Sequence, residues 1–287
     1  MRIIWSGCSV RGPLCVLVGL VLLLATPRLA DAQEAINTPA ATQPGAGNFV
    51  NTWKLRFTHY NGTPAGDDGS ADEIRLEGLL AYGFTGDFSM SLRAPLVARS
   101  VSGAPTIDGE TGVGDLTLEF KYRFWQDDFG AVDTIRASVF AGAELPTGNS
   151  SLGSESVDPH VGAVVTYING RHGLNQALSW KFNTDGADEV WRAGDAKADL
   201  LRFDTAYLYR LSPEEYGADF VASTYAVVEL NGTYETNGDT ELFISPGLLY
   251  EAPRFALELS VSMPVFQNVD HRPEPEYSVG VGVRFLF

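Results

Sequence analysis

The sequence predicts an all-β protein: an antiparallel, up-and-down transmembrane β-barrel of about 12 strands. The clearest observation is segment 277–287, YSVGVGVRFLF, in which apolar residues alternate with Ser, Gly or Arg. Period 2 puts the apolar residues on one face of a strand, as a wall between lipid and water requires. An export signal and a regular alternation of long and short connections, described below, lead to the same fold.

Residues 1–32 have the pattern of a cleaved signal peptide. Two arginines precede an unbroken apolar run from Leu14 to Ala25, and the small residues of 30–32 offer a cleavage site before Gln33. The run holds 12 residues, fewer than the roughly 20 that a membrane-spanning helix needs. Both cysteines lie in this segment, so we expect a mature chain without disulfide or thiol chemistry.

The chain is acidic, with 20 basic and 36 acidic residues and a formal net charge of −16. Without residues 1–32 these counts become 17 and 35, and the net charge becomes −18. No basic stripe is present to neutralise phosphates, so we expect no nucleic-acid partner. No second apolar run approaches spanning length, which excludes a helical membrane protein. A soluble β-sandwich or a membrane barrel remains.

The segment 33–48 has its own composition, rich in Ala, Pro, Gly, Gln and Asn and without periodicity. This composition predicts a flexible periplasmic tail. The alternative is that the tail folds back and plugs the lumen of the barrel, which occupies residues 49–287.

Period-2 alternation predicts twelve strands in the remainder of the chain. Most hold ten to twelve residues, which is long for a soluble strand and suits a tilted strand that crosses a bilayer. An even number is also typical of single-chain bacterial barrels. The approximate ranges are 50–60, 73–83, 88–98, 115–125, 133–145, 158–168, 174–183, 200–211, 219–230, 241–251, 255–265 and 276–287.

The connections favour the barrel over the sandwich. Long connections, such as 99–114 and 184–199, alternate with short ones, such as 84–87 and 252–254, along the whole chain. If both termini are periplasmic, every long loop lies outside the cell and every short turn lies in the periplasm. This asymmetry is typical of outer-membrane barrels. Aromatic residues near the predicted periplasmic strand ends could form the inner aromatic girdle.

The polar faces of the strands supply candidate pore-lining residues. In 115–125, for example, Glu119, Lys121 and Arg123 share one face opposite apolar neighbours. Such charges could set a field across a pore or could pair with one another and stabilise the wall. Lys54, Arg56 and Glu73 also fall on inward faces. The candidate pore-lining residues are Arg75, Glu77, Arg93, Glu119, Lys121, Arg123, Arg136, Glu144, Lys181, Arg202, Asp204, Glu229 and Arg284.

Inward-facing aromatics give a hint about the solute. Phe140, Tyr225 and Phe243 alternate with outward residues on their strands. Aromatic rings in a lumen suit an aromatic or amphipathic solute better than an inorganic ion, although each ring could equally fill space.

Two motifs carry a family resemblance. Segment 112–124, GVGDLTLEFKYRF, and segment 143–149, AELPTGN, which leads to a strand starting at Asp158, resemble stretches of the Putative MetA-pathway of phenol degradation family. The resemblance implies an outer-membrane barrel that acts as a transporter, and it implies the barrel more firmly than it implies phenol. Gly112 and Gly114 open a strand and not a helix, so they are no dinucleotide site.

We therefore expect an outer-membrane channel or transporter for small molecules, aromatic or amphipathic compounds among them, in a Gram-negative bacterium. The alternatives are an outer-membrane lipid hydrolase and a structural barrel without transport. The four histidines show no readable spacing to a Ser and a carboxylate, so no catalytic residue, metal or cofactor is expected. Expected partners are outer-membrane lipid, a small-molecule solute and the barrel-assembly machinery, which would bind the C-terminal strand ending in Phe287.

The assigned faces predict the effects of two substitutions. Val281→Arg on the lipid face would cost roughly 2 to 4 kcal/mol near the bilayer midplane. Arg284→Ala on the lumen face would alter conductance more than folding.

Overall fold

A computed structural model describes residues 35–64, 66–103, 109–149, 152–186, 190–216 and 221–287. The predicted signal peptide, and residues 33 and 34 of the predicted tail, lie outside these residues. Nowhere in the described part of the chain is there a helix long and apolar enough to cross a membrane.

The described residues form thirteen strands, which follow one another along the chain and pair antiparallel with their neighbours in the sheet. They are β1 (Phe49–Thr63), β2 (Gly66–Gly83), β3 (Phe88–Ser102), β4 (Glu110–Val113), β5 (Leu116–Asp128), β6 (Thr134–Leu145), β7 (Asp158–Asn169), β8 (His172–Lys181), β9 (Leu200–Ser212), β10 (Ser223–Glu235), β11 (Thr240–Ala252), β12 (Phe255–Asn268) and β13 (Glu274–Leu286). Most lie within a few residues of the predicted ranges.

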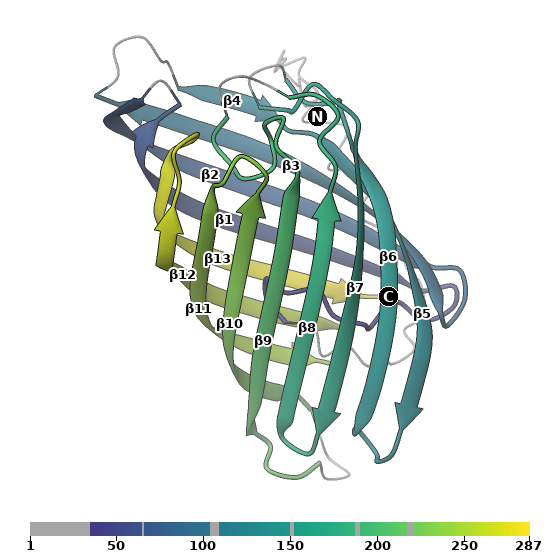
Figure 1. Ribbon diagram of the computed structural model, residues 1–287. Helices are drawn as coiled ribbons and strands as arrows, with labels where there is room; N and C mark the ends of the chain where they lie inside the picture. The colour runs from purple at the N-terminus through teal and green to yellow at the C-terminus, as the bar shows by residue number, and fades with distance from the viewer. Residues whose placement is uncertain (1–34, 65, 104–108, 150–151, 187–189, 217–220) are drawn as a thin grey trace, which may run out of the picture.

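The sheet closes on itself, because β1 pairs with both β2 and β13. The first and last strands are therefore neighbours, and the strands run up and down around a barrel (Figure 1). Except at β4, which pairs with β3 only, each described strand pairs on both sides. The backbone groups of the wall therefore find most of their partners within the sheet, as a bilayer demands. The predicted fold class is confirmed.

The wall has twelve strand positions, because β4 and β5 follow one another at a single position beside β3. Strand β3 pairs with β4 along Leu96–Arg99 and with β5 along Phe88–Arg93. Residues 114 and 115 separate β4 from β5. The predicted strand 115–125 is therefore one of two segments at an interrupted strand position. The predicted long loop 61–72 is also different: β1 and β2 extend through most of it.

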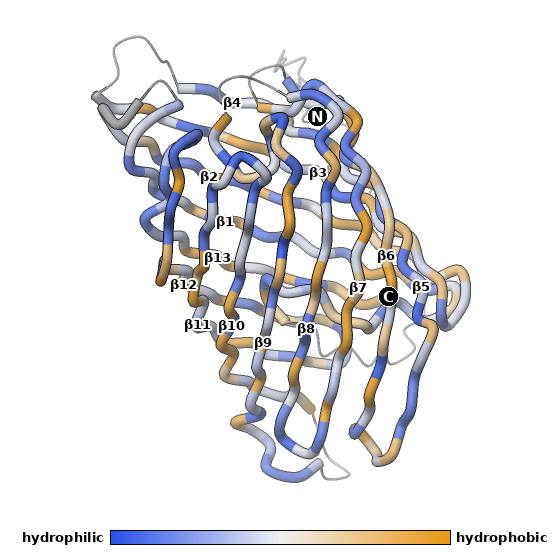
Figure 2. Tube along the Cα trace, in the orientation of Figure 1, coloured by the Kyte–Doolittle hydropathy of each residue, from blue (hydrophilic) through white to orange (hydrophobic). Residues whose placement is uncertain are grey.

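The two faces of the wall differ as predicted. Many large apolar side chains of the strands are exposed on the outer face. Hydrophobic and hydrophilic positions alternate along the strands, as the colours in Figure 2 show. At a β-bulge in β5 the register shifts between Arg123 and Trp125. The bulge leaves two successive aromatics, Phe124 and Trp125, both more than half exposed on the outside. An apolar outer wall around a polar interior is the arrangement of a membrane-spanning barrel.

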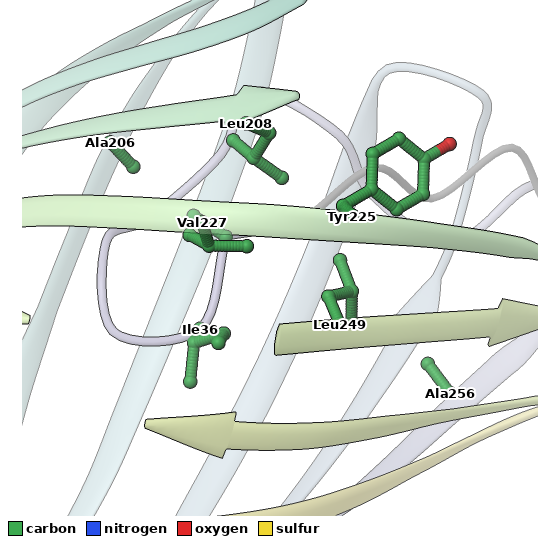
Figure 3. Packing of buried hydrophobic residues seen from close by; sticks show 8 residues of the cluster. Ile36, Ala206, Leu208, Tyr225, Val227, Leu249 and Ala256 are labelled. Atoms are coloured by element: carbon green, nitrogen blue, oxygen red, sulfur yellow. The ribbon is translucent and has the colours of Figure 1, made fainter. Parts of the chain in front are cut away.

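The tail differs from the flexible periplasmic segment that its composition favours. Residues 35–44 lie inside the barrel, and Ala35, Ile36 and Ala41 are nearly fully buried. Ile36 packs against inward side chains of β9, β10, β11 and β12, among them Leu208, Val227 and Leu249 (Figure 3). The arrangement corresponds to the alternative in which the tail occupies the lumen.

Candidate functional site: the lumen and its tail

Glu229 anchors the upper part of the tail. Its carboxylate accepts hydrogen bonds from the backbone N–H groups of Ile36, Asn37 and Thr38, at 2.8 to 3.4 Å. These groups belong to a segment without secondary structure, so they would otherwise be unsatisfied in the interior. A carboxylate in the middle of β10 replaces the partners that a strand would supply.

The lower part of the tail is held by several strands. The Ala41 N–H donates to Thr166 Oγ1 at 2.8 Å, and the Lys121 ammonium donates to the Ala40 carbonyl at 3.1 Å. At the end of the barrel where β1 begins, the Gly47 N–H donates to the Gly83 carbonyl at 2.8 Å. A Cβ on Gly83 would meet the Pro44 and Gly45 carbonyls at 2.4 Å, so the close approach requires glycine there.

Two cavities adjoin the tail. The upper cavity, which we call the chamber, has a volume of about 310 Å³ and extends from Asn37 to Arg192 and Arg272 in the outer loops. The lower cavity has a volume of about 180 Å³ and follows the tail toward the periplasm. The two cavities have five lining residues in common, so they lie next to each other at this level of the barrel. The shared residues are Ile36, Asn37, Lys54, Glu77 and Arg93.

The loop between β8 and β9 folds inward over the chamber. Trp191 is 7% exposed and packs edge-on against Tyr60, with ring centroids 5.9 Å apart. The Arg99 guanidinium lies 4.5 Å from the centre of the Trp191 ring, within the range of a cation–π interaction. This loop therefore covers part of the chamber from the outer side.

The predicted pore-lining residues fall into four groups. Arg75, Glu77, Arg93, Arg202 and Asp204 line the chamber. The lower cavity is lined by Glu77 and Arg93 again, and by Glu119, Lys121 and Arg284. Two pairs form elsewhere on the wall, Arg123 with Asp87 at 2.8 Å and Lys181 with Glu144 at 3.6 Å, while Arg136 lies 3.7 Å from Asp128 at the periplasmic end. Glu229 is covered by the tail.

Two of these residues make structural contacts that the sequence pattern does not reveal. Glu229 is 0% exposed and holds the tail, so it does not face an open route. Arg284 is 2% exposed and forms an ion pair of 2.5 Å with Glu258, so its main contact is structural. In both cases the period-2 pattern gives the correct face, but it cannot show what covers that face.

Four residues of the chamber escape the sequence pattern: Asn37, Trp191, Arg192 and Arg272. They come from the tail and from connections, where no periodicity marks an inward direction. The only sequence signal is weak, namely a Trp-Arg pair in an otherwise small and acidic loop.

The histidines contact carboxylates or a phenol. His59 lies 2.7 Å from Asp72, His160 lies 3.3 Å from Glu119, His172 lies 2.6 Å from Tyr207, and His271 lies 2.8 Å from Asp239. None of these four contacts includes a serine. Over the described ranges, no group of three or more His, Cys, Asp or Glu side chains could hold a metal ion.

The two sequence motifs meet at the outer end of the wall. The Asp115 carboxylate accepts the N–H groups of Thr147, Gly148 and Ser154, at 2.6 to 2.9 Å. In return, the Asn149 amide oxygen accepts the Val113 N–H at 2.8 Å. The gap between β4 and β5 is therefore filled by the loop after β6, and each motif supplies the partners of the other.

A sequence profile of the Putative MetA-pathway of phenol degradation family matches residues 92–277, which include both motifs. The chain belongs to this family. The match covers most of the barrel wall, from β3 to β13, and it leaves the tail and the first two strands outside. No curated protein matches the chain.

Solved structures share the fold of this family member. The COG4313 outer membrane channel from Pseudomonas putida F1 is 15% identical with a TM-score of 0.61, over 84% of this chain and 96% of that one. The NanC porin is 14% identical with a TM-score of 0.47, over 81% and 98%. The CymD monoaromatic hydrocarbon channel is 10% identical with a TM-score of 0.45, over 85% and 89%. At 15% identity the first likeness shows the barrel fold alone. The TM-scores of the other two lie below 0.5.

Proposed function

We propose that the protein is an outer-membrane channel for small molecules, and that solutes pass through the chamber and the lower cavity alongside the tail. The observation that carries the proposal is the pair of adjoining polar cavities inside a closed barrel with an apolar outer wall. A purely structural barrel of this size would gain nothing from a hollow interior, whereas a route for solutes needs one.

Two further observations support the proposal. The interior carries charged and aromatic side chains that contact cavities, and such groups give a route its selectivity. The family membership and the fold shared with a protein described as an outer membrane channel agree with transport. We infer an outer-membrane location from the same fold and from the predicted signal peptide.

The tail defines the size class of the solute. It crosses the lumen from mid-wall, at Glu229, to the periplasmic end, at Gly83. Cavities of 310 and 180 Å³ favour small molecules over oligosaccharides or peptides. An aromatic or amphipathic compound of that size fits the aromatic rings that reach the interior, among them Phe140 and Phe243.

A liposome-swelling assay tests the proposal. The refolded mature chain, shown to be folded by its heat-modifiable mobility on a gel, is placed in vesicles and exposed to solutes of increasing size. We expect swelling with small amphipathic solutes of one ring and none with trisaccharides. Folded protein that admits no solute of any size would contradict the channel and return weight to a structural or enzymatic barrel.

A further inference from the structure

The chamber is basic inside an acidic protein. Seven basic and four acidic side chains line it, although the whole chain has a net charge of −16. An excess of cations in the interior is therefore a local feature of the chamber and not a consequence of composition. In a narrow interior such charges act at close range and with weak screening.

Ion pairs account for most of the charge, but not for all of it. Each of the four acidic residues has a basic partner in the lining, and Lys54 lies 3.3 Å from the buried Glu258. The four lining pairs are Arg75 with Glu73 at 3.1 Å, Arg93 with Glu77 at 3.5 Å, Arg202 with Asp204 at 2.7 Å and Arg272 with Glu241 at 2.7 Å. Arg56 and Arg192 form no such pair, although Asp195, Glu73 and Glu144 attract Arg192 from a greater distance.

Neither of these two guanidinium groups has a carboxylate oxygen of the described residues within 4.0 Å. Arg56 feels attraction from Glu77, but it is repelled by Arg75, Arg192 and Arg202. Arg192 extends from the inward-folded loop and is exposed to the space of the chamber. Two cations that repel each other across a cavity favour an anion between them.

The tail orients one of the two cations. The Arg56 side chain donates to the Asn37 amide oxygen at 2.5 Å. The N–H end of the same amide is buried and interacts with the Glu229 carboxylate. The tail therefore holds the Arg56 guanidinium in place at the chamber.

We propose that the chamber binds the carboxylate of a small organic acid, with Arg56 and Arg192 as its donors. The inference rests on the proposed function and names the solute class of that same route. Guanidinium groups recognise carboxylates through paired N–H donors. Tyr60, Trp191 and Phe243 also line the chamber, so a flat apolar body attached to the carboxylate finds aromatic surface.

The proposal separates two neighbouring possibilities. A chamber that only attracts inorganic anions would bind chloride as well as an organic acid. A chamber that only contacts rings would bind a neutral aromatic compound equally well. Binding of an aromatic carboxylate above both comparisons is the specific result.

Calorimetric titration of the refolded mature protein in detergent tests the site. Benzoate is the probe, and benzamide is its neutral counterpart of nearly the same shape. We expect benzoate to bind at least tenfold more tightly than benzamide, and not to be displaced by an equal concentration of chloride. Equal binding of benzoate and benzamide, or displacement by chloride at that concentration, would overturn the proposal.

Substitutions locate the site. Arg56→Gln and Arg192→Gln should each weaken benzoate binding about tenfold, the usual effect of losing one charge-assisted hydrogen bond, with little change for benzamide. Arg254→Gln is the matched control, because Arg254 is exposed in the periplasmic turn after β11. Unchanged benzoate binding in Arg192→Gln, whose loop position does not belong to the wall, would overturn the assignment even if Arg56→Gln failed to fold.

The outcome is distinguishable from failure of the channel. If solutes swell vesicles but benzoate shows no preference over benzamide, the route stands and the carboxylate site falls. If neither swelling nor binding occurs in folded protein, both fall.

Discussion

At the scale of single residues, the charged side chains inside this barrel are of two kinds. Some are sealed in ion pairs, such as Arg284 with Glu258, where both side chains are nearly fully buried. Others, such as Arg56, reach a cavity without a carboxylate partner. Only the second kind is free to meet a solute, so charge and inward direction are not sufficient to identify a pore residue.

Arg284→Ala should therefore affect folding strongly, contrary to the expectation from alternation alone. It leaves the Glu258 carboxylate, 4% exposed, with Lys54 as its remaining ion partner at 3.3 Å. Loss of one member of a buried ion pair costs about 3 to 5 kcal/mol. The check is the free energy of unfolding in a urea titration in lipid vesicles, with Arg254→Ala as the exposed control within about 0.5 kcal/mol of wild type.

Val281→Arg tests the opposite face at the same strand. Val281 is 47% exposed on the outside of β13, and an arginine near the bilayer midplane costs roughly 2 to 4 kcal/mol. The same titration measures it. An unfolding free energy equal to that of wild type would mean that this face does not contact lipid.

Asp115 is the third residue whose environment decides its role. Its carboxylate receives three backbone N–H groups from the loop after β6. Asp115→Asn turns one acceptor into a donor that faces these groups, so we expect a loss of about 2 kcal/mol or more and faster proteolysis of that loop. Asp127→Asn, at an exposed position of β5, is the control and should leave cleavage at the wild-type rate.

At the scale of elements, strands were predictable and the tail was not. A strand that separates lipid from water must alternate, so β13 or β5 can be read from period 2. The tail has no period, and its partners, such as Glu229 and Thr166, lie more than a hundred residues away in the sequence. Composition alone describes a flexible segment, while the hydrogen bonds that order it belong to the tertiary structure.

Interruptions of strands follow the same division. The break between β4 and β5 depends on Asp115 and on a loop that arrives from β6, which the resemblance of the motifs signals but does not explain. The bulge at Phe124 likewise depends on the partner strand. Single-strand periodicity contains neither kind of information.

The connection between β12 and β13 gives a prediction about pH. The hydrogen bond with the Asp239 carboxylate, at 2.8 Å, raises the pKa of His271 above its ordinary 6.5. Burial opposes this shift, and the negative charges of Asp239, Asp270 and Glu235 add to it. A raised histidine pKa means that the contact stabilises the connection at low pH and is lost as the pH rises through the raised value.

An NMR titration of the His271 ring checks this prediction. We expect a midpoint above 6.5 in the wild type, and a lower midpoint in Asp239→Asn. After division by the intrinsic, base-catalysed rate, the protection of the amides in the connection against exchange should fall at high pH in the wild type only. A His271 midpoint that does not respond to Asp239→Asn would show that the hydrogen bond is not formed in solution.

At the scale of the whole molecule, the structure combines a wall that sequence rules determine with an interior that they do not. Strand number, the lipid face and the orientation of loops follow from alternation and from connection length. The chamber, by contrast, is assembled from Asn37 of the tail, Arg56 of the wall and Arg192 of a loop. Only closure of the barrel brings these three residues together. The sequence could therefore predict the residues that the wall contributes to the candidate site, but not those of the tail and the loop.

Because of the tail, the open space inside the barrel is narrower than the number of strands alone would leave. Twelve strands lie between small barrels, whose interiors side chains fill, and porins, whose interiors are open. Here a segment of the chain occupies part of the remaining space and leaves two adjoining cavities. Size selection would then depend on the tail as much as on the wall.

The most direct test of this account compares the single-channel conductance of the full mature chain with that of a chain lacking residues 33–44, in planar bilayers. The wall closes without the tail, so both proteins should fold and show heat-modifiable mobility. We predict a small conductance for the full chain and a conductance several times larger without the tail. Equal conductances of the two folded proteins would contradict a route through the lumen that the tail narrows.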